Sequence, residues 1–134
     1  EGAQALLTDE QGFITEGTGN NFFMVRDGEI TTPKGHNILR GVSRGACIDL
    51  AHKLDIPLRE ADIYPYDVRE ADEAWFTSTT ICMLPITRFN FQPVGNGQVG
   101  PIYRRLLEAW SEEVGVDIAA QARDYAEMMD TWNP

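Results

Sequence analysis

An acidic residue beside a glycine-rich turn is the first feature of this sequence that could do chemistry. Glu16 precedes a Gly-Thr-Gly turn at residues 17–19, and paired asparagines and phenylalanines follow at residues 20–23. Residues 39–44 read Leu-Arg-Gly-Val-Ser-Arg and open a segment with helical spacing. The free backbone N–H groups at the start of such a helix can hold an anion such as phosphate. The two segments together predict a cofactor cradle, made of a carboxylate and an anion-binding helix start.

Lysine, which could anchor a cofactor covalently, does not lie where the cradle would need it. The sequence has two lysines, Lys34 and Lys53. Lys34 follows a proline in a polar loop and Lys53 lies at a predicted helix end, so we expect both to be solvated. His36 could reach the mouth of the cradle, although a lone histidine in a loop is more often simply exposed. No covalent anchor is therefore predicted in this chain.

The elements that must position these residues begin with strands. Asp27-Gly28 predicts a tight hairpin, because both central positions of a two-residue turn need a positive φ. Apolar residues then recur on one face of a predicted helix, at Ala46, Cys47, Leu50, Ala51 and Leu54. The elements predicted in this half are strands at residues 4–8, 13–15, 21–26 and 29–32, a turn at 9–12, and a helix at 43–54.

In the second half, strands and helices alternate. We expect chemistry at the bend formed by residues 79–82, between two strands rich in aromatic and β-branched residues. A second hairpin is expected to close at the Gly-Asn-Gly of residues 95–97, and a helix to start at Pro101 and stop at Gly115. This pattern predicts a mixed α/β fold, with a mixed or antiparallel sheet and helices outside. The other predicted elements are strands at residues 56–64, 73–78 and 83–89, and helices at 66–71 and 118–129.

Composition narrows the function classes. The 134 residues suit one domain, and we expect residues 1–134 to be a single domain excised from a larger protein, because the first residue is Glu1 rather than Met. The net charge of -10 argues against a nucleic-acid partner. Without an apolar run of membrane length or a signal peptide, we expect a cytoplasmic protein. Cys47 and Cys82 lack zinc or disulfide spacing and predict free thiols. A dinucleotide GxGxxG motif is excluded, since Phe22 stands at its third glycine.

With these residues laid out, the chain resembles the class IV aminotransferases. These fold-type-IV pyridoxal-phosphate enzymes include branched-chain and D-amino-acid aminotransferases and aminodeoxychorismate lyase. Residues 76–80 and 85–88 also look like the strand-turn-strand of that family, and the resemblance covers about residues 4–115. It implies the large C-terminal domain, with a barrel-like mixed sheet and flanking helices. The family's signature positions are filled here by Glu16, Thr18, Asn21, Phe22, Phe23, Ile30, Thr32, Leu39, Gly41, Val42 and Arg44.

The resemblance implies pyridoxal 5'-phosphate as cofactor and a role for several residues. Glu16 would pair with the pyridine nitrogen and keep it protonated, so that the ring can act as an electron sink. Leu39 would pack against the ring. The Thr80 and Ile81 backbone would face the carboxylate of an amino-acid or 2-oxo-acid substrate. The phosphate would be held at the helix start and the bend, by Gly41, Val42, Ser43, Thr79 and Thr80.

The chain also departs from the family pattern. The Schiff-base lysine of these enzymes lies further before the signature glutamate than the available residues reach, so we expect it upstream of Glu1. The small N-terminal domain is missing as well, and Arg40 stands where many relatives have proline. The resemblance therefore implies that the intact parent is a homodimeric aminotransferase and that this chain alone is inactive.

Other interpretations of the same residues stay open. Glu16 alone would most often be a solvated turn residue, Ser43 an ordinary helix cap, and Thr79 and Thr80 plain strand-end residues. The parent could instead be a pyridoxal-phosphate lyase of the same fold, or the chain could be a non-catalytic binding module that has lost the lysine. An acidic interaction domain without ligand would leave the signature unexplained. An apolar stripe near the end could complete a core or mediate oligomer contacts, and consists of Tyr125, Met128, Met129 and Trp132.

Overall fold

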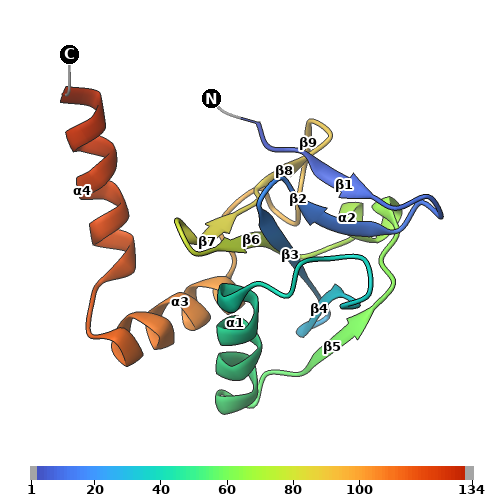
Figure 1. Cartoon of the computed structure of the whole chain (residues 1–134), viewed down its shortest axis with the longest axis horizontal. Helices are drawn as coiled ribbons and strands as arrows, with labels where there is room; N and C mark the ends of the chain where they lie inside the picture. The colour runs from blue at the N-terminus through green and yellow to red at the C-terminus, as the bar shows by residue number, and fades with distance from the viewer. Residues whose placement is uncertain (1–2, 132–134) are drawn as a thin grey trace.

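The computed structural model describes residues 3–131, which fold into a mixed sheet flanked by helices (Figure 1). Helices α1 and α3 lie on one face of the sheet, and α4 follows the end of α3 and stands apart from the strands (Figure 1). The mixed α/β architecture predicted from the sequence is therefore confirmed. The elements are β1 (Leu6–Thr8), β2 (Ile14–Gly17), β3 (Asn20–Arg26), β4 (Glu29–Pro33), α1 (Val42–Lys53), β5 (Leu58–Ala61), α2 (Pro65–Arg69), β6 (Glu73–Ser78), β7 (Cys82–Pro85), β8 (Arg88–Phe89), β9 (Gln92–Pro93), α3 (Pro101–Val114) and α4 (Ile118–Thr131).

Strand β3 is the centre of the sheet. It pairs antiparallel with β2 through its first residues, with β4 through its last residues, and with β6 along most of its length. The predicted Asp27-Gly28 turn joins β3 to β4, with φ of 52° and 79° at the two residues. Strand β5 adds parallel to β4, which makes the sheet mixed. A barrel-like sheet was expected, but the strand pairs within residues 3–131 form an open sheet and do not close into a barrel.

Side chains on the two faces of β3 pack into two separate hydrophobic cores. Phe23 and Val25 pack toward α1 and α3, where the ring of Phe23 stacks on Trp75 with centroids 5.6 Å apart. Phe22 and Met24 pack on the other face, against residues that include Val68 of α2. Alternation along a strand sends successive side chains to opposite faces, so the paired phenylalanines serve one core each.

A buried carboxylate joins the sheet to α3. Glu73 begins β6, and its Oε1 and Oε2 accept the backbone N–H groups of Ile102 at 2.9 Å and Tyr103 at 2.8 Å. These N–H groups have no partner within a helix, and the helix dipole favours a negative charge beside them. The N-cap residue Gly100 passes so close that an added Cβ would lie 2.0 Å from the Glu73 side chain. The Glu73 side chain therefore caps the start of α3, and only glycine fits at position 100 beside it.

Two predicted strands and the predicted second hairpin differ from the structure. The strand expected at residues 83–89 is divided into β7 and β8, and the strand expected at 56–64 is reduced to β5. The second hairpin does not close at residues 95–97: it joins β8 to β9 and turns at Asn90 and Phe91, with φ of 47° and 67°. Gly95 lies in the loop before α3 instead, where an added Cβ would lie 2.1 Å from the carbonyl oxygen of Asp72. Glycine at position 95 thus allows a close approach between two backbone segments and does not form a hairpin turn.

The described side chains of the predicted apolar stripe, Tyr125 and Met128, do not complete a core. Tyr125 and Met128 are 59% and 63% exposed. Trp132 lies outside the described residues, and so does the side chain of Met129. α4 is exposed along residues 121–128, because it contacts the rest of the described chain chiefly through the end of α3.

Candidate cofactor site

The carboxylate of Glu16 is held at one end of the sheet by two donors. Glu16 lies on β2, directly opposite Asn21 of β3. Its Oε2 accepts the backbone N–H of Leu39 at 3.0 Å and the side-chain Nδ2–H of Asn21 at 3.1 Å. Its Oε1 has no hydrogen bond to another residue within the described part of the chain. One carboxylate oxygen is thus fixed by the protein, and the other is left for a donor from outside.

Leu39 has a fixed backbone and a free side chain. Besides donating its N–H to Glu16, it accepts Asn21 Nδ2–H at 2.7 Å and the N–H of Gly41 at 2.9 Å on its carbonyl oxygen. Its side chain is nevertheless 76% exposed. Holding an apolar side chain in water gains nothing for folding, so the arrangement suits an apolar group that covers it.

The start of α1 follows directly and offers unpaired N–H groups. The N-cap residue is Gly41, and no side chain in the described chain caps the helix. The N–H groups of Val42 and Ser43 precede the first intrahelical bond, which Gly45 donates to the Gly41 carbonyl at 3.0 Å. Val42 is 79% exposed, and the first turn contains no acidic residue that would repel an anion. The donors therefore fit a phosphate group.

Gly41 also fits against Asn21, because a Cβ added there would lie 2.3 Å from Asn21 Oδ1. The backbone conformation of Gly41 itself, with φ of -62° and ψ of 145°, is open to other residues. Glycine is needed at this position for space rather than for φ.

The bend after β6 lies at the same end of the sheet. Thr77 of β6 is opposite Asn21 of β3, so the bend starts just past the row that Glu16 and Asn21 occupy. Within the bend the hydroxyls of Ser78 and Thr80 are hydrogen-bonded at 3.1 Å. Thr79 and Thr80 are exposed, and Ile81 is 38% exposed. Strand pairing thus brings the bend to the end where Glu16 lies, and no hydrogen bond joins its threonines to α1 within residues 3–131.

A buried arginine anchors α1 to the sheet. Arg44 donates from Nη2 to the carbonyl oxygen of Pro33 at 3.0 Å and also pairs with the Glu60 carboxylate. These bonds tie the first turn of α1 to the ends of β4 and β5. Arg40 is exposed, and its guanidinium lies against Gly35, where an added Cβ would be 2.9 Å from Nε. The signature arginine therefore fixes the helix start to the sheet, while Arg40 stays on the surface.

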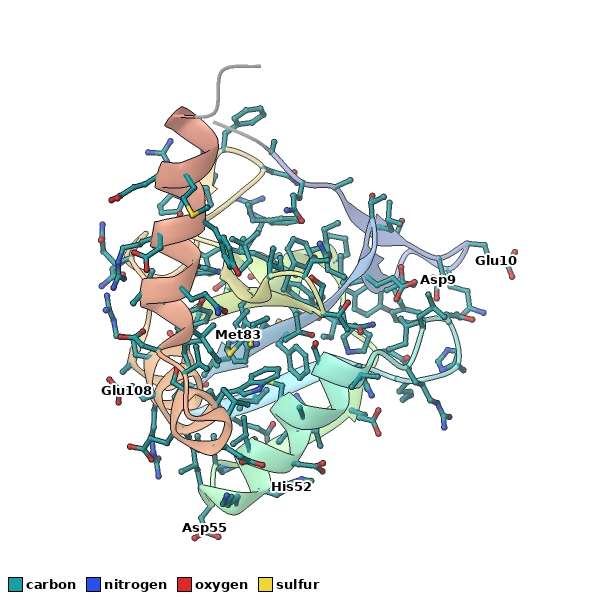
Figure 2. The ribbon with its side chains drawn as sticks, turned by 60° about the vertical axis from the view of Figure 1, so that its left-hand side comes forward. Asp9, Glu10, His52, Asp55, Met83 and Glu108 are labelled. Carbon is teal, nitrogen blue, oxygen red and sulfur yellow. The ribbon has the colours of Figure 1, made fainter. Side chains whose placement is uncertain are left out.

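The loop that leads to Leu39 is tied to the β1–β2 turn. Asp9 lies beside this loop (Figure 2), and its carboxylate accepts Asn37 Nδ2–H at 3.0 Å. Desolvation would raise the pKa of Asp9, but hydrogen bonds from Phe13, Asn37 and Gln11 together lower it. His36 is exposed and lines a small cavity in this region, whose lining includes neither Glu16 nor Leu39. The structure therefore does not bring His36 into the Glu16 and Leu39 contact network.

The two lysines are paired with carboxylates. Lys34 Nζ lies 2.6 Å from Asp62 Oδ2, and Lys53 Nζ lies 3.3 Å from Glu113 Oε2. Lys53 is at the C-terminal end of α1, next to His52, which Figure 2 shows at the end of the helix far from the Leu39 loop. Neither lysine is hydrogen-bonded to Glu16 or to the start of α1 within the described chain.

Sequence reasoning gave Asn21 no role beyond filling a signature position, yet Asn21 joins Glu16 to Leu39. The signal was present in the sequence, because an amide at the start of a strand that continues as Phe22 and Phe23 is buried and must find partners. Its partners, 5 and 18 residues away, could not be named from spacing.

A larger hollow lies elsewhere on the surface. A groove of about 530 Å³ separates α3 from α4 and shares no residue with the Glu16 network. Its lining includes Arg104, Glu108 and Arg123.

None of the helices within residues 3–131 has the length and apolar character needed to cross a membrane.

Known proteins are similar to this chain in sequence and in fold. The family description "Amino-transferase class IV" matches residues 1–89. A probable branched-chain-amino-acid aminotransferase of Aquifex aeolicus is 34% identical over 113 residues, covering 83% of this chain and 36% of the relative. A D-alanine aminotransferase of Listeria monocytogenes is 40% identical over 102 residues, covering 75% and 35%.

Solved structures agree with the sequence relatives. The branched-chain amino acid aminotransferase of Escherichia coli matches with a TM-score of 0.78 and 33% identity, over 80% of this chain and 37% of that one. A similar match, with a TM-score of 0.79, is a branched-chain amino acid aminotransferase solved with pyridoxamine 5'-phosphate. The chain thus spans little more than a third of the length of these relatives. On the family match and on the sequence and fold of these relatives, the chain belongs to the class IV aminotransferases.

Proposed function

We propose that this chain is the pyridoxal 5'-phosphate-binding part of an aminotransferase. The observation that supports this most is the fixed pair of Glu16 and Leu39 beside the uncapped start of α1. A carboxylate with one free oxygen, an exposed apolar side chain and unpaired helix N–H groups match the three parts of the cofactor, which are its ring nitrogen, its ring face and its phosphate.

Each residue then has a defined task. Glu16 Oε1 would accept a hydrogen bond from the protonated pyridine nitrogen, and the negative carboxylate would keep that nitrogen charged. Leu39 covers one face of the ring and excludes water from it. When bound, pyridoxal phosphate supplies the electron sink that stabilises negative charge at the substrate α-carbon. The phosphate is held by the backbone at Gly41, by the amides of Val42 and Ser43 with the Ser43 hydroxyl, and by the hydroxyls of Thr79 and Thr80.

The substrates follow from the same proposal. The intact enzyme moves an amino group between an amino acid and a 2-oxo acid, and the Thr80 and Ile81 backbone faces the substrate carboxylate. The lysine that this reaction requires comes from a segment outside this sequence, since Lys34 and Lys53 are paired with carboxylates elsewhere. Residues 1–134 are the C-terminal domain of that enzyme. It has a small N-terminal domain and acts as a homodimer in the cytoplasm, and this chain alone is inactive.

A pyridoxal-phosphate titration tests the proposal. The chain is compared with its Glu16→Gln variant by equilibrium dialysis, and Glu10→Gln, on the exposed β1–β2 turn, serves as the matched control (Figure 2). We expect weak binding, reduced about tenfold in Glu16→Gln and unchanged in Glu10→Gln. Borohydride treatment should trap no cofactor on this chain. Covalent trapping at Lys34 or Lys53, or equal binding by all three proteins, would contradict the proposed site.

A further inference from the structure

The contacts of Asn21 form a closed ring of hydrogen bonds. The side-chain Nδ2 gives one hydrogen to Glu16 Oε2 and the other to the carbonyl oxygen of Leu39, while the N–H of Leu39 returns to the same Glu16 oxygen. The distances around the ring are 3.1, 2.7 and 3.0 Å. Asn21 is only 5% exposed, so its amide is shielded from competing water. Two side chains thus act on Leu39 as a neighbouring strand would, satisfying both its N–H and its C=O.

The chemistry of this ring suits asparagine in particular. The two groups to be joined, a carboxylate and a carbonyl, are both acceptors, so the link between them needs two donors on one atom. A neutral amide supplies them on a short side chain, whereas aspartate has none and serine has one. The remaining atom, Oδ1, lies against Gly41, as the 2.3 Å approach of an added Cβ shows. A single buried side chain therefore contacts three successive parts of the site.

We propose that Asn21 is a positioning residue of this site, which locks the Glu16 carboxylate and the Leu39 segment into one rigid unit. This inference deepens the proposed function and rests on it for the identity of the ligand. Since Asn21 has both Nδ2 hydrogens engaged with protein acceptors, it acts through Glu16 and Leu39. Without it, Glu16 would keep only the Leu39 N–H, and the loop would lose its side-chain link to β3.

The neighbouring asparagine provides a matched control. Asn20 is on the same strand and is also buried, but its side chain lies on the opposite face and donates to Gln4 Oε1 at 2.6 Å. Alanine at position 20 removes the same chemical group from the same strand end, away from Glu16 and Leu39. A general weakening of the start of β3 would follow from either change, whereas loss of positioning would follow only from a change at Asn21.

The first experiment measures amide exchange of Leu39 by NMR in the free chain, with Asn21→Ala, Asn21→Asp and Asn20→Ala compared. We expect amide exchange at Leu39 to become about tenfold faster in both Asn21 variants, because the Glu16 carboxylate that accepts the Leu39 N–H is no longer held by Asn21. In Asn20→Ala the exchange rate at Leu39 should stay within about twofold of that in the unchanged chain. Asn21→Asp is nearly isosteric, so it decides the result if the alanine variant does not fold. Unchanged exchange at Leu39 in a folded Asn21 variant would overturn the proposal.

The second measurement uses pyridoxal phosphate as the probe. In the Asn21 variants its dissociation constant should rise about tenfold and its bound absorption maximum should shift, because Glu16 no longer faces the ring in one orientation. Asn20→Ala should leave both unchanged, and equal effects of the Asn20 and Asn21 changes would overturn the positioning role. Failure of the unchanged chain to bind the probe would count against the proposed function alone, because exchange at Leu39 is measured without ligand.

Discussion

The backbone N–H of Tyr103 donates a buried hydrogen bond of 2.8 Å to Glu73 Oε2. Glu73 is the first residue of β6, and Tyr103 lies in the first turn of α3. The same carboxylate accepts Ile102 N–H, so both of its oxygens are used by the helix start. The hydroxyl of Tyr103 in turn donates to the Met83 carbonyl at 3.0 Å. Helix α3 is thus attached to β6 and β7 by polar contacts as well as by its apolar face.

Replacing this carboxylate with an amide should weaken the attachment of α3. In Glu73→Gln one of the two acceptors becomes an NH₂ group that faces a backbone N–H, so we expect the free energy of unfolding to fall by about 1–3 kcal/mol in urea denaturation. Glu70→Gln, at the exposed end of α2, is the control and should change stability by less than about 0.5 kcal/mol. Equal stability of the two variants would show that the Glu73 cap contributes nothing.

Replacing two buried threonines should have opposite effects on stability. Thr32 is fully buried and its hydroxyl donates to the Phe22 carbonyl at 2.7 Å, whereas Thr77 is 1% exposed and its hydroxyl has no partner among the described residues. Thr32→Val should therefore lower the free energy of unfolding by about 1–2 kcal/mol, and Thr77→Val should leave it unchanged or raise it by about 1 kcal/mol. Chemical denaturation of both variants decides the matter. A clear loss of stability in Thr77→Val would mean that its hydroxyl is satisfied in solution.

Two glycines at the start of α1 should respond differently to alanine. An added Cβ at Gly41 would collide with Asn21 Oδ1, whereas Gly45 has nothing within 4 Å. Gly41→Ala should weaken pyridoxal-phosphate binding about tenfold or more, because Asn21 and the Leu39 segment must move. Gly45→Ala should instead raise the free energy of unfolding by about 0.5–1 kcal/mol, as helix propensity predicts, and leave binding unchanged. Dialysis and thermal unfolding of the two variants provide the check, and preserved binding in Gly41→Ala would contradict the proposed geometry.

Alkaline pH should destabilise the fold through its buried thiol. Burial raises the pKa of Cys47 from 9.0 to about 12. Below pH 9.0 the thiol is protonated in both states, and its contribution to stability is fully present. As the pH rises from 9.0 toward about 12, the unfolded chain loses this proton while the folded chain keeps it, so the free energy of unfolding falls.

Urea denaturation on either side of pH 9.0 measures this fall. Cys47→Ala should show a shallower pH slope, even if its stability at neutral pH is lower because of the lost packing. Burial also raises the pKa of Cys82 to about 11 and of Tyr103 to about 12, so part of the slope should persist in the variant. An identical slope in the variant and the unchanged chain would show that Cys47 does not hold its proton in the folded state.

Where local chemistry decides the structure, the sequence was sufficient. The Asp27-Gly28 turn and the end of α3 at Gly115, with φ of 68°, each depend on a residue that tolerates positive φ, and both were predicted. The β8–β9 hairpin was missed because Asn90 and Phe91 take the turn, and a phenylalanine at φ of 67° has no local preference for that conformation. The hairpin predicted at residues 95–97 is wrong, because the glycine at position 95 is required by the close approach of the Asp72 backbone, a contact that is distant in sequence.

The same distinction applies to the site. The residues at Glu16, Leu39 and Gly41 were predicted from a family resemblance, and the structure places them in one network. The group that joins them is Asn21, which pairs with residues on β2 and in the loop before α1. Such bonds depend on strand pairing and loop path, so spacing along the chain does not predict them. A resemblance supplies the members of the site, and only three-dimensional contacts supply its connections.

The doubled residues at the start of β3 make the alignment of this strand ambiguous. A slip by one residue would send each of these four side chains to the opposite face of the sheet, and each face would still receive one asparagine and one phenylalanine. Hydrophobic alternation therefore discriminates poorly against the slipped state over these four residues. The Asp27-Gly28 turn must supply the discrimination, because a two-residue turn fixes which residues of β3 and β4 face each other. The accuracy of the Glu16 site is thus set at the far end of the strand, by a turn that takes no part in binding.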